Sequence, residues 1–143
     1  NAAGDSIVNF IVKTYEDFKE ILFAGDGAAE IDHVYAFTEV PEGFTETERV
    51  LNDDMSFVRY ENNDTGAVIE LHQTATDDAS FALDKENNNS RIFSYRGKEI
   101  IACYSESAGT YDAFWTEDEC NMKLMCLGIT NYDELFDMVS ALE

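Results

Sequence analysis

From Ile31 onward the apolar residues of this sequence recur at every second position, in segments of four to eight residues separated by turn-forming residues. A period of two is typical of β-strands, whose successive side chains point to opposite faces of a sheet. The sequence therefore predicts a β-sheet of about six to seven strands. The predicted strands are residues 31–37, 55–60, 67–74, 91–95, 99–105, 111–116 and 122–129.

The connections between these segments are short and rich in residues that form tight turns. They include residues 40–43 with Pro41, the only proline, and residues 62–66, 87–89, 96–97 and 107–109. Because a parallel crossover needs a dozen or more residues, connections this short join antiparallel neighbours. We therefore expect a curved antiparallel sheet with the order of a meander.

The N-terminal segment has a spacing that predicts a helix. Its apolar residues recur at steps of four, four, three and four: Ile7, Ile11, Tyr15, Phe18 and Leu22. Residues 19–23 also fit a short strand, because Ile21 and Phe23 alternate with Glu20, so the nature of this stretch stays open.

The C-terminal segment predicts a second helix. Thr130 and Asp133 resemble a capping box. Four apolar residues follow at i, i+3, i+4 and i+7: Leu135, Met138, Val139 and Leu142. A helix this short depends on tertiary packing, so we expect its apolar stripe to lie on the sheet.

These elements together predict an α+β fold in one domain over residues 1–143. It would comprise an N-terminal helix and connection (residues 1–30), an antiparallel sheet (31–129) and a C-terminal helix (130–143), with both helices packed on one face. Nothing in the sequence marks a linker or a repeat.

The charge restricts the classes of partner. The chain has 30 acidic and 9 basic residues, a net charge of −21 at pH 7. Such a charge opposes association with nucleic acid or with an anionic bilayer surface. No run of eighteen apolar residues and no basic stretch before an apolar one occurs, so we expect neither a transmembrane helix nor a signal peptide within these residues.

The three cysteines indicate no disulfide framework, because their number is odd and the chain is long enough to fold without one. We expect Cys103, Cys120 and Cys126 to be buried or half-buried free thiols; one disulfide with one free thiol stays open. The gap between Cys120 and Cys126 is too wide for a paired zinc ligand. The acidic clusters do not fit a calcium loop, and we expect no metal and no cofactor.

Alternation over residues 67–74 places Gln73 on the apolar side of its strand, with Ile69 and Leu71. A buried amide is costly without hydrogen-bond partners. The favoured interpretation is that Gln73 ties a loop to the sheet; the alternative is that it contacts a ligand.

Glu70 and His72 lie two residues apart on the other face of the same strand. A hydrolytic role would need a second carboxylate, such as Asp84 or Glu86, and the sequence has no Gly-x-Ser-x-Gly motif. We favour a solvated pair in which Glu70 makes His72 slightly more basic, and we predict no catalytic residues.

Aromatic residues are concentrated in the late strands. If the helices cover one face of the sheet, the other face exposes aromatic area, and such a patch usually marks a binding surface. The favoured alternative is that extra loops, or simply scattered single residues, cover this face. The candidate binding surface comprises Gln73, Tyr95, Tyr104, Tyr111 and Trp115.

Several short segments carry a family resemblance. They are residues 40–44 (VPEGF), 58–62 (VRYEN), 64–66 (DTG), 69–73 (IELHQ), 83–87 (LDKEN), 95–99 (YRGKE), 114–116 (FWT), 127–129 (LGI) and 133–135 (DEL). In order and spacing, residues 32–143 resemble the domain-of-unknown-function family 4367 of Gram-positive bacteria. The resemblance implies the extracytoplasmic part of a membrane protein with one anchor upstream, sometimes with an anti-sigma-factor segment in the cytoplasm. It implies no catalytic residues, since none are established for that family.

The resulting hypothesis is a non-enzymatic extracytoplasmic sensing or interaction domain of a membrane-anchored bacterial protein. Its partner would be a peptide, a protein or an envelope component, with no nucleic acid, and it would meet the membrane only through the upstream anchor. One alternative is a cell-envelope hydrolase that uses Glu70, His72 and a second carboxylate. The other is a purely structural spacer.

Overall fold

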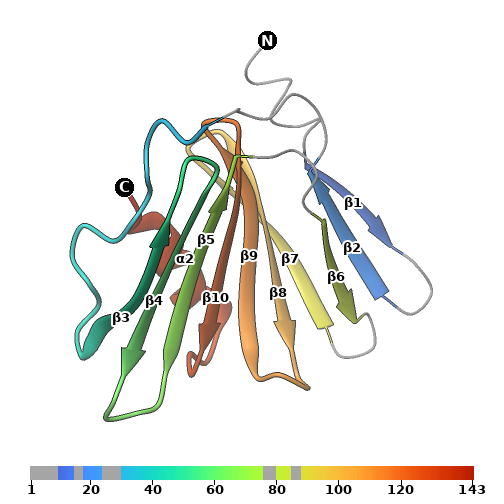
Figure 1. The fold of residues 1–143 in the computed structure, drawn as a ribbon. Helices are drawn as coiled ribbons and strands as arrows, with labels where there is room; N and C mark the ends of the chain where they lie inside the picture. Colours follow the sequence, from blue (N-terminus) through green and yellow to red (C-terminus); the bar gives the residue numbers. More distant parts are fainter. Residues whose placement is uncertain (1–9, 15–17, 24–29, 76–79, 85–87) are drawn as a thin grey trace.

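The computed structural model describes residues 10–14, 18–23, 30–75, 80–84 and 88–143 (Figure 1). The chain forms two antiparallel sheets and one short helix, α2 (Tyr132–Ser140). The larger sheet contains β3 (Phe44–Leu51), β4 (Met55–Asn62), β5 (Val68–Thr74), β7 (Asn88–Tyr95), β8 (Lys98–Ser105), β9 (Thr110–Glu117) and β10 (Cys120–Leu127). The smaller sheet contains β1 (Phe10–Thr14), β2 (Phe18–Phe23) and β6 (Ser80–Asp84).

The larger sheet has the strand order β3-β4-β5-β10-β9-β8-β7, and every pairing in it is antiparallel. The predicted antiparallel sheet of about six to seven strands is therefore confirmed, but the predicted single meander is wrong. The sheet instead consists of two meanders, β3 to β5 and β7 to β10. The pairing of β10 with β5 joins them. The chain leaves the sheet after β5 and contributes β6 to the smaller sheet before it returns.

Tight turns hold the hairpins of the larger sheet in register. In the turn before β5, the amide of Gly66 donates to the carbonyl oxygen of Asn62 at 2.8 Å, with Gly66 at φ 78°. The Oδ1 atom of Asn62 also accepts from the amides of Asp64 and Thr65. The short connection predicted at residues 62–66 is thus an antiparallel hairpin turn.

The main core lies between the larger sheet and α2, which packs behind the sheet in the view of Figure 1. Leu135 and Val139 of α2 are buried, as is Leu142 just beyond it. They pack with inward-facing residues that include Val58, Tyr60, Ile69, Leu71, Ala102, Trp115, Met122 and Leu124. The predicted seal of the sheet by the C-terminal apolar stripe is confirmed.

The sheet is also buried on part of the face that points away from α2. Phe114 is fully buried there, and its cross-strand neighbour Ile101 is only 6% exposed. The late strands therefore do not present Phe114 as exposed aromatic area, because this part of the sheet is covered on both sides.

No helix forms in the described part of residues 7–22, so the predicted N-terminal helix is wrong there: residues 10–14 and 18–23 are strands. A spacing of four is even, so it also places residues on one face of a strand, and it does not distinguish the two structures. The one step of three, from Tyr15 to Phe18, falls between the two strands. The alternative strand at residues 19–23 is the structure found. The fold is mostly β.

Residues 31–37 were expected to form a strand, but in the structure they form an irregular segment. Only Phe37 makes a β-bridge, with Leu142. The backbone of this segment is satisfied by other groups: Ile31 donates to the carbonyl oxygen of Asp53, and Gln73 bonds to His33 and Tyr35. Because these backbone groups already have hydrogen-bond partners, they do not need those of a neighbouring strand.

Helix α2 (Tyr132–Ser140) begins two residues later and ends three residues earlier than the predicted range of 130–143. Asn131, not Thr130, is the N-cap residue, and its Oδ1 atom accepts from the amide of Glu134 at 2.9 Å. The Glu134 carboxylate in turn accepts from the amide of Thr130 at 3.0 Å. The cap is therefore shifted by one position, because Asn131 is as good a cap as threonine, and the return bond of Glu134 goes to the residue before the cap. Among the described residues, no helix has the length and apolar composition needed to cross a membrane.

Candidate functional site

Two cavities lie at the two ends of α2, on the side of the sheet that the helix covers. We call the one beside Val139 and Leu142 the Tyr95 pocket, and the one beside Asn131, Tyr132 and Asp133 the Tyr132 hollow. Each is bounded by β7 or its turn, by late strands and by one helix end. The rigid sheet therefore fixes the walls of both cavities.

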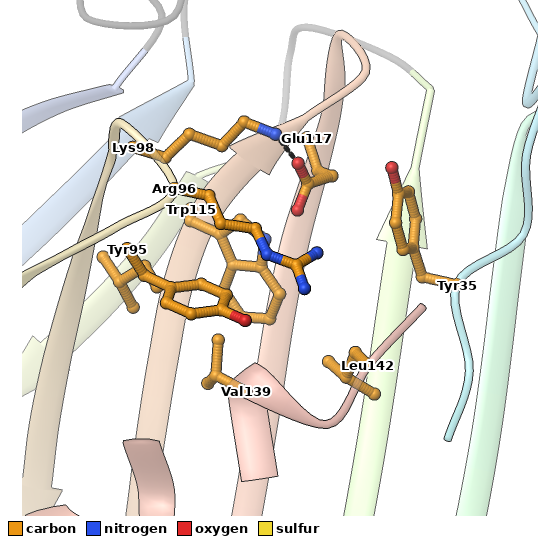
Figure 2. A pocket seen from close by; sticks show the side chains of 9 residues that line it. Tyr35, Tyr95, Arg96, Lys98, Trp115, Glu117, Val139 and Leu142 are labelled. Carbon is orange, nitrogen blue, oxygen red and sulfur yellow. Dashed lines mark ion pairs between the residues drawn. The ribbon is translucent and has the colours of Figure 1, made fainter. Parts of the chain in front are cut away.

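The Tyr95 pocket has an apolar floor and a polar rim (Figure 2). The floor consists of Ile100, Trp115, Val139 and Leu142, all buried. The rim consists of Tyr35, Tyr95, Arg96, Lys98 and Glu117. The enclosed space is about 10 Å³, which is room for one water molecule.

The turn between β7 and β8 sets the position of Arg96. Arg96 has φ 53° and Gly97 has φ 76°, the paired positive values of a two-residue type I′ hairpin turn. From this turn the Arg96 guanidinium lies 5.0 Å from the centre of the Tyr95 ring. Figure 2 shows it in front of Trp115, between Tyr95 and Tyr35. The turn thus places a cation over the mouth of the pocket.

The other polar groups of the rim are already paired. Lys98 forms an ion pair with Glu117, and the Tyr35 hydroxyl donates to the carboxylate of Asp118. Burial lowers the pKa of Lys98, against the attraction of Asp118. Burial also raises the pKa of the Tyr35 hydroxyl, as does its bond to Asp118. Tyr35 therefore stays neutral near pH 7.

The Tyr132 hollow is larger and more open, with a volume of about 270 Å³. Arg91 of β7 lies 4.7 Å above the centre of the Tyr132 ring. Tyr111 packs edge-on against the same ring, 5.1 Å between centres, and its hydroxyl donates to the carbonyl oxygen of Thr130 at 3.1 Å. The hollow therefore combines fixed aromatic walls with one guanidinium.

Arg91 and Arg96 differ from the arginines elsewhere in the sheet. Arg49 pairs with Glu46 at 2.7 Å, and Arg59 pairs with Glu70 at 3.0 Å. In the part of the chain that the structure describes, neither Arg91 nor Arg96 forms an ion pair; each lies on a tyrosine ring instead. Both guanidinium groups are therefore available to an acidic group from outside.

The five residues of the candidate binding surface do not form one surface. Tyr95 and Trp115 line the Tyr95 pocket, and Trp115 is only 2% exposed. Tyr104 and Tyr111 lie in contact at the opposite end of α2, with 4.6 Å between ring centres and 40° between ring planes. Gln73 lies inside the protein, apart from both groups.

Gln73 has the structural contacts that the favoured interpretation requires. Its Oε1 atom accepts from the amide of Tyr35 at 3.0 Å, and its Nε2 atom donates to the carbonyl oxygen of His33 at 2.7 Å. Gln73 thus ties the segment around residue 35 to β5. Because Tyr35 forms part of the rim, Gln73 also positions one wall of the Tyr95 pocket.

Glu70 and His72 lie together on the face away from α2, with 3.7 Å between His72 Nε2 and Glu70 Oε1. The expectation that His72 is more basic than usual is wrong. Burial lowers its pKa, and so does Lys123, while Glu70 opposes them. The side chains of Asp84 and Glu86 lie outside the described residues.

Asp112 is an ionisable residue that the sequence analysis missed. It lies on β9 and is 8% exposed, and its Oδ1 atom is buried without a hydrogen-bond partner. Burial raises its pKa to about 6, against the attraction of Lys123. The available signal was an acidic residue within an otherwise apolar run.

The three cysteines are buried and free, as predicted. Burial raises the pKa of Cys126 to about 12, so this thiol is unreactive near neutral pH. Among the described residues, no group of three His, Cys, Asp or Glu side chains is placed to hold a metal ion.

The geometry defines an open antiparallel β-sheet domain whose C-terminal helix separates two arginine-bearing cavities. The sequence model of the family described as Domain of unknown function (DUF4367) matches residues 34–142. The chain belongs to this family, so the resemblance found from the short segments is confirmed. A search of curated proteins gives no match, and a search of solved structures gives none either.

Proposed function

We propose that this chain is a non-enzymatic, extracytoplasmic interaction domain that binds a carboxylate-bearing component of the cell envelope. The observation that carries the proposal is the pair of arginines at the ends of α2. Each guanidinium lies on a tyrosine ring beside a cavity and forms no ion pair within the described residues.

Guanidinium groups bind carboxylates through two parallel hydrogen bonds, and they remain charged at any physiological pH. In a chain with net charge −21, acidic side chains are abundant, yet Arg91 and Arg96 do not pair with any described one. The aromatic walls add contact area for a partner, and ordering aromatic side chains on binding costs little conformational entropy. These features support recognition of an acidic partner at the α2 side of the sheet.

The stem peptides of peptidoglycan carry carboxylates, so purified Gram-positive sacculi are a suitable first probe. We expect the chain to sediment with sacculi at about 0.15 M NaCl, where salt screens the longer-range repulsion between the negatively charged chain and the wall. The double variant Arg91→Gln/Arg96→Gln should bind at least about tenfold more weakly, a loss of ~1.4 kcal/mol. Arg49→Gln is the matched control, because Arg49 already pairs with Glu46 at the far edge of the sheet. Equal sedimentation of the double variant and the control would contradict the proposal.

We further propose that a segment upstream of these residues anchors the protein in the membrane. The domain would then sense its partner outside the cell on behalf of a cytoplasmic regulator of the anti-sigma-factor type. Its support is the family resemblance. The test is protease treatment of intact cells that express the full-length gene with a C-terminal tag. Loss of the tag before lysis is the expected result, and protection of the tag until lysis would refute the extracytoplasmic location.

A further inference from the structure

We propose that the Tyr95 pocket is a binding site for a single carboxylate carried next to an apolar group, such as the C-terminal residue of a peptide, and that Arg96 is both its lid and its anion-binding group. This inference rests on the proposed function, since it assigns a ligand class to one of the two cavities that carry that function.

Arg96 is exposed, it forms no ion pair with a described side chain, and its guanidinium lies 5.0 Å from the centre of the Tyr95 ring. It projects from a two-residue turn, so its side chain can rotate without any change in the sheet. Its guanidinium lies over Trp115 at the mouth of the pocket (Figure 2). Rotation of this side chain therefore opens the pocket.

The floor under Arg96 is apolar and rigid. Trp115 and Ile100 come from two neighbouring strands, and Val139 and Leu142 come from α2 and the residues after it. The enclosed space of about 10 Å³ is too small for any group larger than water, so an apolar side chain must take the place of the Arg96 stem. The floor then gives the apolar side chain of the ligand a contact surface from which water is excluded.

The charges of the rim favour a monocarboxylate. The Lys98 ammonium is neutralised by Glu117, and the Asp118 carboxylate accepts from the Tyr35 hydroxyl, which leaves the Arg96 guanidinium for a ligand. The net charge of −21 repels polyanions over a longer range. A ligand with a single carboxylate is attracted by Arg96 at short range and is repelled less than a ligand with several negative charges.

Trp115 is the only tryptophan of the chain, so its fluorescence reports directly on this pocket. The probes are N-acetyl-L-leucine and its neutral counterpart N-acetyl-L-leucinamide, which have nearly the same shape. We expect a saturable change in Trp115 emission with the acid, and binding of the amide at least about tenfold weaker, because only the acid accepts a charge-assisted pair of hydrogen bonds from Arg96.

Arg96→Gln should weaken binding of the acid by about tenfold and bring it close to that of the amide, whereas Arg49→Gln should leave both unchanged. Circular dichroism spectra of the variants check that they fold. No emission change with the acid, or equal responses to acid and amide, would overturn the inference. Sacculi binding without binding of N-acetyl-L-leucine defeats this inference alone. The converse result defeats the proposed envelope function and leaves the pocket assignment standing.

Discussion

Gln73 shows how one polar residue can connect distant parts of the fold. It is 1% exposed, and it supplies both an acceptor and a donor to the backbone of residues 33–35. The buried amide is therefore satisfied, and a segment without regular structure acquires a fixed position. One wall of the Tyr95 pocket depends on this contact, because Tyr35 belongs to that segment.

Replacing Gln73 with leucine should destabilise the chain by about 2–3 kcal/mol. The substitution conserves volume but leaves the amide of Tyr35 and the carbonyl oxygen of His33 without their partner. Urea unfolding measures this free energy. Asn63→Ala is the control, because Asn63 is exposed in a turn. A variant as stable as wild type would show that Gln73 does not fix the segment.

Asp112 makes stability depend on pH. Its pKa is about 6 in the folded chain, against an ordinary value of 3.8 for an aspartate in water, so the folded chain binds its proton more tightly than the unfolded chain. The stabilising contribution of the protonated form is complete below about pH 4 and is lost as the pH rises through 6. Asp112→Asn should therefore stabilise the chain at pH 7.5 by up to about 2–3 kcal/mol more than at pH 4.

Urea unfolding of Asp112→Asn and wild type between pH 4 and pH 8 measures this difference. Asp137→Asn, an exposed position on α2, is the control. A difference between the variant and wild type that stays constant over this range would contradict the raised pKa.

At the scale of elements, period two correctly locates the strands whose buried and partly buried residues alternate, such as β4 and β5. It misses β3 because seven of its eight residues are exposed and give no apolar alternation. The bulge between Glu46 and Glu48 and the charges on this edge strand discourage pairing with other chains. An edge strand of this kind carries little hydrophobic signal in its sequence.

Sequence patterns alone could not predict the order of the strands or the location of the site. Alternation says which residues share a face, but nothing local says that β10 pairs with β5 rather than ending a meander. Likewise, the concentration of tyrosines was visible, yet their division between two cavities depends on where α2 lies. Arg91 and Arg96 were missed as site residues because an arginine without an ion pair is recognised only in three dimensions.

Leu135→Ala tests the packing of α2 on the sheet. Leu135 is 1% exposed in the core, so its truncation should cost about 2–5 kcal/mol of unfolding free energy. Asp137→Ala, on the exposed side of the same helix, should cost less than about 0.5 kcal/mol. Chemical denaturation compares the two. Equal stability of the two variants would mean that α2 does not seal the core.

At the scale of the whole molecule, the net charge of −21 dominates. The described ion pairs, such as Arg59 with Glu70, neutralise only a few of the 30 acidic side chains. Repulsion among the remaining carboxylates opposes the compact state and extends over a Debye length, about 30 Å at 0.01 M salt and about 8 Å at 0.15 M.

The melting temperature should therefore rise by several degrees between about 0.01 M and 0.15 M NaCl, because salt screens this repulsion. Differential scanning calorimetry at pH 7.5 measures it. A melting temperature that stays level or falls over this range would show that self-repulsion is not a main determinant of stability.

The central claim is that the chain binds its partner at the α2 side of the sheet, through Arg91 and Arg96. The most direct test is NMR mapping of the ¹⁵N-labelled chain with soluble muropeptides prepared from Gram-positive sacculi. We expect shifts of backbone signals in the turn at residues 95–98, around Arg91 and at residues 131–133, with none around Glu70 and His72. Shifts confined to the Glu70 and His72 side of the sheet, or none at saturating muropeptide, would contradict it.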